Sequence, residues 1–180
     1  MQYKFILTLL STIMITLQSS ATQREIPHSC NADGERFYCV DEHQQPLNGK
    51  IYETWENGKY KSIINYKKGY ADGLATYFND EGKLMERVYY KQGIKNGMDK
   101  IYYDNRTIKV WAQYNNGELD GWQNFYTDEG KQQGKAYYKR GKLTGGYCLA
   151  DLPNRRQKVN ISREQIEKNG FNQLFQCEAK

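Results

Sequence analysis

Short apolar stretches alternate with glycine-marked polar turns through the middle of this chain, and the alternation repeats every 24 residues. Four blocks begin at Gly49, Gly73, Gly97 and Gly121, and each aligns with the next without an insertion. Each block has two runs rich in Tyr, Phe, Ile, Val and Trp, which are residue types that favour strands. A fixed period of this length indicates small supersecondary units that bury their apolar faces only by stacking. We therefore predict two strands of about five to seven residues in each block.

The turn between the two strands of a block has its own signature. It reads Glu56-Asn57-Gly58 in the first block and Asp-Glu-Gly in the second and fourth blocks. Asn, Asp and Gly suit hairpin turns because the chain needs positive φ there. The third block has Arg106 in place of the glycine. We expect either that Asn105 takes the left-handed conformation or that Arg106 bears a strain of about 1 kcal/mol.

Alternation within the strands assigns their two faces. One column of the second strand is apolar in every block and is assigned to the core: Ile64, Tyr66, Val88, Tyr90, Ala112, Tyr114, Ala136 and Tyr138. In the first strand we expect Tyr77, Ile101 and Phe125 to point inward and Phe78, Tyr102 and Tyr126 to point outward. The predicted fold is mainly β, an elongated antiparallel sheet of stacked hairpins with disulfide-stapled caps and one short C-terminal helix. A register slip of one residue would exchange the two faces.

The N-terminus predicts export. Lys4 precedes the apolar run from Phe5 to Leu17, and small residues follow at 19–21. The run is short for a membrane span, so we expect a cleaved secretory signal over residues 1–21 and a periplasmic or secreted mature chain.

The remaining chain divides into an N-terminal cap at 22–48, four repeats at 49–146 and a C-terminal cap at 147–180. In the last of these, Tyr147-Cys148-Leu149 predicts a strand, and Ser162 with Gln165 predicts a short helix that ends at Gly170. Residues 171–177 are expected to return as a strand. We expect the caps to cover the open edges of the sheet, which otherwise invite pairing with other chains.

All the cysteines lie outside the repeats, at Cys30, Cys39, Cys148 and Cys177. An even count in an exported chain indicates disulfides. Of the three connectivities we favour Cys30–Cys39 with Cys148–Cys177, because short loops close most easily. Neither a CxxC motif nor paired His is present, so we predict no metal site.

Charge and motifs argue against several function classes. The net charge is +5, but acidic and basic residues interleave through the repeats, which is not typical of a nucleic-acid-binding stripe. The basic cluster Arg155-Arg156 with Lys158 is interpreted as an exposed loop. Paired acids such as Asp80-Glu81 recur at turn positions, where Asp caps its own backbone. With no nucleophile, metal or phosphate-binding motif, we predict no enzyme activity and no cofactor.

The outward aromatic and basic side chains are the candidate partner-binding residues. They are Phe78, Arg87, Tyr89, Tyr102, Trp111, Tyr126, Lys135 and Tyr137. Aromatic residues are favoured as interface anchors, and flanking cations suit an acidic partner. The alternative is that cross-strand aromatic pairs only stabilise the sheet, by about 0.2–1 kcal/mol each.

The recurring order of an aromatic pair, Asp-Glu-Gly-Lys and Tyr-Tyr-Lys-x-Gly-x-x-x-Gly resembles the MORN repeat in its bacterial variant form, from Gly49 to about Gly146. The resemblance implies a β-sheet repeat module for protein–protein and sometimes lipid contacts. Bacterial members of this form resemble antitoxins or immunity proteins, and the family has no catalytic motif to transfer. Departures are Arg106, Glu53-Thr54 in place of the aromatic pair, and the cysteine-bearing flanks, which favour a periplasmic over a cytoplasmic role.

The leading hypothesis is therefore a non-enzymatic exported protein-binding module, a periplasmic immunity protein that masks a toxic effector. The alternative is a carbohydrate- or cell-wall-binding module built from aromatic repeats. Trp55, Trp111 and Trp122 occupy three different places in the repeat, which weakens this alternative. A structural role in the outer envelope is a third option.

Overall fold

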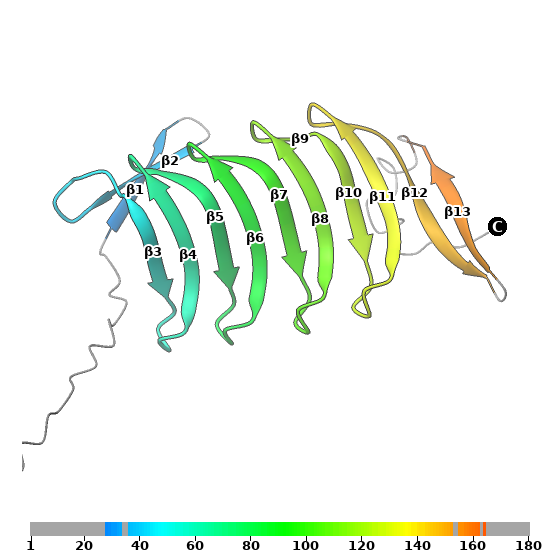
Figure 1. Ribbon diagram of the computed structural model, residues 1–180, viewed down its shortest axis with the longest axis horizontal. Helices are drawn as coiled ribbons and strands as arrows, with labels where there is room; N and C mark the ends of the chain where they lie inside the picture. Colours follow the sequence, from blue (N-terminus) through cyan, green and yellow to red (C-terminus); the bar gives the residue numbers. More distant parts are fainter. Residues whose placement is uncertain (1–27, 34–35, 153–154, 163, 165–180) are drawn as a thin grey trace, which may run out of the picture.

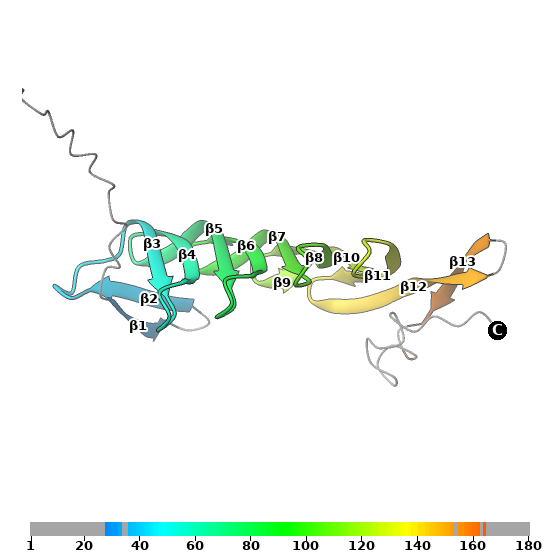
Figure 2. The same cartoon turned by 90° about the horizontal axis from the view of Figure 1, so that it is seen from below.

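The computed structural model describes residues 28–33, 36–152, 155–162 and 164 of the 180-residue chain. One 11-stranded antiparallel sheet runs along the molecule, and a two-stranded hairpin lies at its N-terminal end (Figure 1). Seen edge-on, the sheet is a single elongated layer with the hairpin on one side (Figure 2). The expected mainly β fold of stacked hairpins is confirmed. The predicted signal at 1–21 lies outside the described residues.

The strands follow one another across the sheet as a meander, except that the short β9 pairs only with β8. The separate hairpin consists of β1 (His28–Asp33) and β2 (Arg36–Asp41). The repeats form β3 (Gly49–Thr54), β4 (Tyr60–Lys67), β5 (Tyr70–Phe78), β6 (Leu84–Lys91), β7 (Ile94–Tyr102), β8 (Ile108–Asn115), β9 (Glu118–Leu119), β10 (Gly121–Tyr126) and β11 (Gln132–Lys139). The sheet ends with β12 (Lys142–Leu152) and β13 (Arg155–Ile161).

The turn inside each block is closed by the residue at the glycine position. Gly58 donates its N–H to the Trp55 carbonyl at 2.8 Å, and Arg106 does the same to Tyr103 at 2.9 Å. Arg106 itself takes the left-handed conformation, with φ 68°, so the second of the two expected outcomes holds. Neighbouring turns are also joined: Asn105 Nδ2 donates to the Asp128 carbonyl at 2.8 Å.

A second row of turns connects consecutive blocks. Each has two residues with positive φ, such as Lys68 (52°) and Gly69 (83°), which is the pattern of a type I′ hairpin turn. The glycine N–H then bonds the carbonyl of a residue 22 positions earlier, as Gly93 does to Ala71 at 2.8 Å. These bonds tie each block to the previous one along the edge of the stack.

The glycine that opens a block lies at a bulge. Asn65 faces the three residues 72–74, because Ile64 pairs with Ala75 while Tyr66 pairs with Ala71. Gly73 has φ 101° at this point, a conformation that a Cβ disfavours. The bulge inserts residues into the first strand and keeps the following side chains in register with the next block.

We call the side of the sheet that β1–β2 crosses the inner face, and the opposite side the outer face. The predicted core column lies on the inner face, where Ile64, Val88, Ala112, Ala136 and Tyr138 are buried and the other tyrosines of the column are partly buried. Among the first-strand residues, Phe125 is buried and Tyr77 is partly buried. Ile101 lies on the inner face as predicted, since it pairs with Glu86 and Val110, but it is 40% exposed because these neighbours do not cover it.

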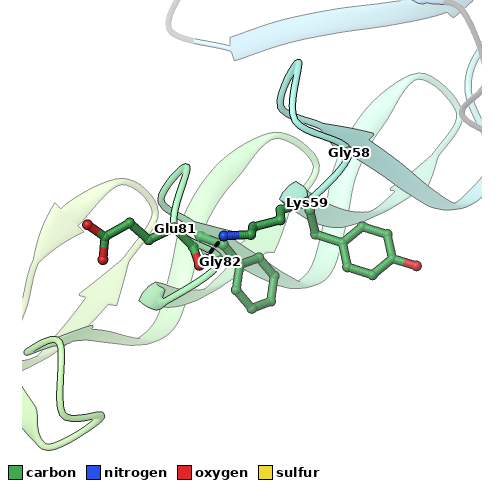
Figure 3. Close-up of a pocket in the computed structure, with 6 residues that line it drawn as sticks. Gly58, Lys59, Glu81 and Gly82 are labelled. Carbon is green, nitrogen blue, oxygen red and sulfur yellow. Dashed lines mark hydrogen bonds between the residues drawn. The ribbon is translucent and has the colours of Figure 1, made fainter.

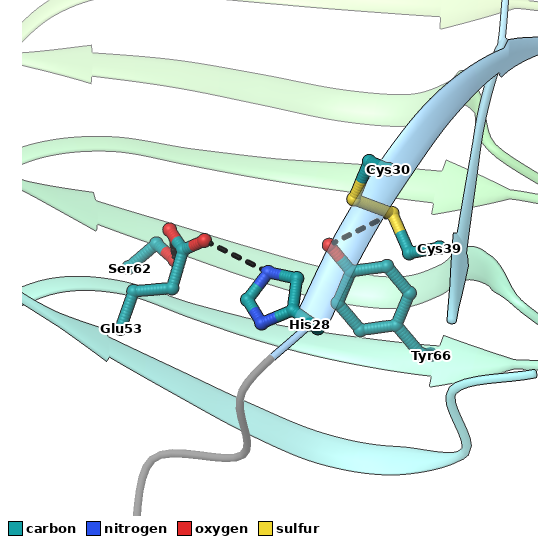
Figure 4. Close-up of a disulfide and its surroundings, with 6 residues drawn as sticks. All are labelled: His28, Cys30, Cys39, Glu53, Ser62 and Tyr66. Atoms are coloured by element: carbon teal, nitrogen blue, oxygen red, sulfur yellow. Dashed lines mark hydrogen bonds and ion pairs between the residues drawn. A yellow bond between two sulfur atoms is a disulfide. The ribbon is translucent and has the colours of Figure 1, made fainter. Parts of the chain in front are cut away.

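The N-terminal cap crosses the inner face of the sheet. We had expected it to cover the open edge instead. Disulfide Cys30–Cys39 joins β1 to β2, as predicted. Figure 4 shows β1 crossing the sheet, with His28 Nε2 3.1 Å from Glu53 Oε1. Cys39 is buried in a cluster with Leu47 and Ile51. In the described part of the chain β3 pairs with β4 alone.

The C-terminal end differs from prediction in two ways. The strand around Tyr147 is longer than expected, and the basic cluster expected in a loop lies in β13 as a terminal strand. Cys148 is buried and disulfide-bonded. Its predicted partner Cys177, the helix to Gly170 and the strand at 171–177 lie outside the described residues.

Candidate partner-binding face

The sheet register brings the predicted partner-binding residues onto the outer face. Arg87 pairs with Lys100, Lys100 with Trp111, and Trp111 with Asn124, which pairs with Lys135. This central row continues from Lys135 to Tyr147 on β12. In the adjacent row, Leu74 pairs with Tyr89 and Trp122 with Tyr137. A third row, near the turns, contains Phe78, Tyr102 and Tyr126.

Several of these side chains are open to solvent. Tyr89 is 42%, Trp111 38% and Trp122 44% exposed. Phe78, Tyr102, Tyr126, Lys135 and Tyr137 are half-buried. Large aromatic groups that keep this much exposure on a flat sheet are typical of interaction surfaces.

Lysines lie over the aromatic rings of this face. Lys100 Nζ is 5.9 Å from the Trp111 ring centroid, and Lys135 Nζ is 5.7 Å from that of Trp122. Trp122 also packs against Tyr137 at 5.0 Å and Tyr147 at 6.1 Å between ring centroids. Cation–π contacts at exposed sites contribute about 0.5–1 kcal/mol each, so they orient these side chains.

Sequence reasoning missed Lys100, Trp122, Tyr147 and Lys158 as members of this face. Lys158 Nζ lies 4.2 Å from the Tyr147 ring centroid on the neighbouring strand. Lys100 and Trp122 stand at repeat positions that other blocks fill with Thr76 and Leu74, so the repeat pattern carried no signal. Cross-strand pairing, which joins positions far apart in sequence, was needed to find them.

Charges that interleave in the sequence separate between the faces of the sheet. The central and adjacent outer rows carry Lys50, Arg87, Lys100 and Lys135, and between Lys50 and Lys139 these rows contain no acidic residue. The acidic side chains lie on the inner face, as Glu53, Glu86 and Asp99, or at the turns, as in Asp80, Glu81, Asp104, Asp128 and Glu129. The outer face is therefore basic and aromatic.

Shallow grooves separate neighbouring turns beside this face. One of about 430 Å³ is lined by Lys59, Tyr60, Phe78 and Glu81, with Lys59 Nζ donating to the Glu81 carbonyl at 3.1 Å (Figure 3). Another, of about 330 Å³, occupies the same place two blocks later, lined by Lys100, Thr107, Ile108, Trp111 and Tyr126. Both can accept an apolar side chain from a partner.

The inner face holds a polar cluster in its middle. Lys95 Nζ donates to Glu86 Oε1 at 2.9 Å and to Asp99 Oδ2 at 2.8 Å, and it lies 5.3 Å from the Tyr114 ring centroid. Burial and the nearby Asp99 carboxylate raise the pKa of Glu86, although Lys95 opposes the shift. Burial alone would lower the pKa of Lys95, but its bonds to both carboxylates raise it.

The described residues bring a hydroxyl to a carboxylate, since Ser62 Oγ donates to Glu53 Oε2 at 2.7 Å and His28 Nε2 lies 3.1 Å from Oε1 of the same group. They also contain no group of three or more His, Cys, Asp and Glu that could hold a metal. None of the helices in the described part is long and apolar enough to cross a membrane. Chemically, the described surface offers docking groups on the outer face and an ionic cluster on the inner face.

No protein-family model and no curated protein matches this chain. Among solved structures, it is similar to a chain in the crystal structure of accessory secretory protein 1, 2 and 3 in Streptococcus pneumoniae, with a TM-score of 0.40 and 15% sequence identity. The similarity covers 83% of this chain and 29% of that chain, so this chain spans under a third of the length of its neighbour.

Proposed function

We propose that this chain is an exported, non-enzymatic protein-binding module whose outer face docks an acidic surface of another protein, and that this partner is a toxic effector that the chain neutralises. The carrying observation is the outer face, where exposed Trp111 and Tyr89 lie among Arg87, Lys100 and Lys135 with no acid in the same rows. Opposite charge steers association and selects the partner, while buried aromatic anchors supply most of the affinity.

Three further features support the proposal. The strands are paired into one continuous sheet, so its face is ordered before a partner binds, which lowers the entropy cost of association. Cys30–Cys39 is a disulfide, which suits an oxidising compartment such as the periplasm. The resemblance of the repeats to the bacterial MORN variant agrees with an immunity role for this surface.

The test is co-expression of the mature chain with the product of the adjacent gene directed to the periplasm. We expect rescue of growth and a stoichiometric complex, and charge reversal of Arg87→Glu with Lys100→Glu should abolish both. Lys131→Glu, which reverses one charge at an exposed turn, is the control and should rescue normally. A complex unaffected by the double reversal would contradict the outer face as the docking surface.

A carbohydrate- or cell-wall-binding module is the second candidate. It is favoured by one observation, the contact of Trp122 with both Tyr137 and Tyr147 at the C-terminal end of the outer face, since adjacent rings can stack on sugars. Retention on peptidoglycan or polysaccharide that Trp122→Ala removes, without any protein complex, would establish this function in place of the first.

A further inference from the structure

The polar cluster of Glu86, Lys95 and Asp99 occupies positions that most other blocks fill with apolar or small residues. The positions equivalent to Lys95 are Leu47, Ala71, Leu119 and Leu143, those equivalent to Glu86 are Ser62, Val110 and Gly134, and those equivalent to Asp99 are Ile51, Ala75 and Gln123. A buried ion pair is often no more stabilising than apolar residues of similar volume. Packing of the sheet therefore does not account for the cluster.

The charges and hydrogen bonds of the cluster do not balance. One ammonium group, that of Lys95, serves two carboxylates, so the cluster has a net negative charge when both are ionised. The Asp99 side chain is only 6% exposed, and its Oδ1 atom is buried without a hydrogen-bond partner. A buried acceptor of this kind destabilises the fold when no donor reaches it.

A second acceptor without a partner lies nearby on the same face. Gln123 Oε1 is also buried and makes no hydrogen bond. Asp99 pairs with Ala112 on the next strand, and Gln123 lies on the strand beyond, since its neighbour Asn124 pairs with Trp111. At about 4.8 Å per strand, the backbones of Asp99 and Gln123 are about 10 Å apart, with the buried Ala112 on the strand between them.

We propose that Asp99, Glu86 and Gln123 form a binding site for one cationic hydrogen-bond donor, an ammonium or guanidinium group held above Ala112. Two N–H···O bonds of about 2.9 Å bridge oxygens at most about 6 Å apart, so the Gln123 side chain has to lean over Ala112 toward Asp99. Such a group supplies the missing positive charge and donors to both unpaired oxygens. The Tyr114 ring, which already faces the Lys95 ammonium, provides an aromatic wall that favours a cation.

The site is reached from the solvent side of the cluster. Lys95 and Glu86 side chains are 32% and 27% exposed, whereas Asp99 lies beneath them. A ligand enters past these flexible side chains, and Gln123, which is only partly buried, rotates to admit it.

The probes are butylammonium and butylguanidinium, with tetramethylammonium as a cation that has no N–H donor. We expect the first two, and not the third, to shift the NMR signals of the Ala112 amide and the Gln123 side-chain amide. Asp99→Asn should weaken binding at least tenfold, and Lys95→Met, which removes the competing cation, should tighten it. Equal shifts from all three cations, or no shifts at all, would overturn the proposal.

A block-matched triple variant separates binding from folding. Glu86→Val, Lys95→Leu and Asp99→Ala copy the residues at Val110, Leu119 and Ala75, so we expect an unchanged or higher Tm together with complete loss of cation binding. A large fall in Tm would mean that the cluster is a structural element of the sheet and would overturn the inference.

This inference does not rest on the proposed function, because it concerns the opposite face. Trp111→Ala on the outer face should leave butylguanidinium binding unchanged. Comparison of butylguanidinium with the peptide Gly-Gly-Arg-Gly-Gly identifies the source of the cation: tighter binding of the peptide indicates a protein segment, and equal binding indicates a free small cation.

Discussion

Gly69 packs directly under the Tyr38 ring. A Cβ built on Gly69 would lie under 3.0 Å from two carbons of that ring, which is closer than real Cβ contacts. Gly69 also donates its N–H to the Leu47 carbonyl at 2.9 Å, and its own carbonyl accepts from Cys39 at 2.8 Å. The first inter-block turn is therefore the place where the N-terminal hairpin is fastened to the sheet.

Gly69→Ala should destabilise the protein by about 2–4 kcal/mol, combining positive-φ strain with overpacking against Tyr38. Gly58→Ala is the matched control, because Gly58 has a similar φ of 78° but nothing within 4 Å of its Cβ position. It should cost only about 1 kcal/mol. Urea denaturation of both variants measures the difference, and equal losses would show that Tyr38 moves freely.

Arg106→Gly should raise the free energy of unfolding by about 1 kcal/mol, because glycine relieves the left-handed strain. The reciprocal control is Gly130→Arg in the next block, where φ is 82° and the Cβ position has an ordinary 3.4 Å contact. It should lower stability by a similar amount. Thermal midpoints that move in the opposite directions would contradict this account of the turn.

Trp111→Ala should weaken partner binding by about 2 kcal/mol or more while changing stability less, as expected for an exposed interface anchor. Calorimetric titration against the partner and a parallel unfolding curve measure the two effects. Phe37→Ala, an exposed aromatic on the N-terminal hairpin, is the control and should bind normally. If Trp111→Ala unfolds the protein, the residue belongs to the core and not to the docking face.

Glu86 should make stability fall as pH rises. Its folded-state pKa is raised above 4.5 by burial, so its stabilising contribution is complete below pH 4.5 and is lost as pH rises through the folded value. Glu86→Gln removes this titration. We expect the variant to gain stability relative to the wild type between pH 4 and 7, measured by urea midpoints at each pH; a constant difference would rule out the shift.

Tyr138 should limit stability at high pH. Burial first, and then the charge of Tyr114, raise its pKa from 10.0 to about 12. Its contribution is full below pH 10 and is lost as pH rises through about 12. Tyr138→Phe should flatten the alkaline limb of the stability curve. Absorbance of tyrosinate during alkaline unfolding checks this, and an unchanged alkaline limb would contradict it.

The repeat region was predictable because local chemistry and period agree there. The glycine at each turn reflects the positive φ that the turn needs, and the alternation around Val88 and Ala112 reflects the two faces of a strand. Both depend only on residues that are close in the sequence. The faces of Arg87, Trp111 and Lys135 were correct for the same reason. Ile101 points inward as predicted, but its exposure depends on Glu86 and Val110 across the sheet and not on its own strand.

Features that depend on long-range pairing were not predictable. The separation of charges between the two faces cannot be seen in the linear sequence. Glu86 and Arg87 are adjacent in the sequence, but their side chains point to opposite faces of the sheet. The crossing of β1 over Glu53 follows from tertiary packing, and no local signal marks it. The inner ionic cluster was visible in the sequence only as separate departures from the repeat at Glu86, Lys95 and Asp99, which the alternation argument did not connect.

The pairing of β11 with β12 has a consequence for how the array stops. Within the repeats one residue faces three at each bulge, but Tyr138 pairs with Leu143 and Tyr137 with Gly145, which leaves one extra residue in place of two. After this bulge, side chains at equivalent repeat positions lie on the opposite face of the sheet. A further copy of the 24-residue unit would therefore expose its apolar face to water. The fold thus carries its own termination signal, and insertion of whole 24-residue units should be tolerated upstream of Gly145 but not after it.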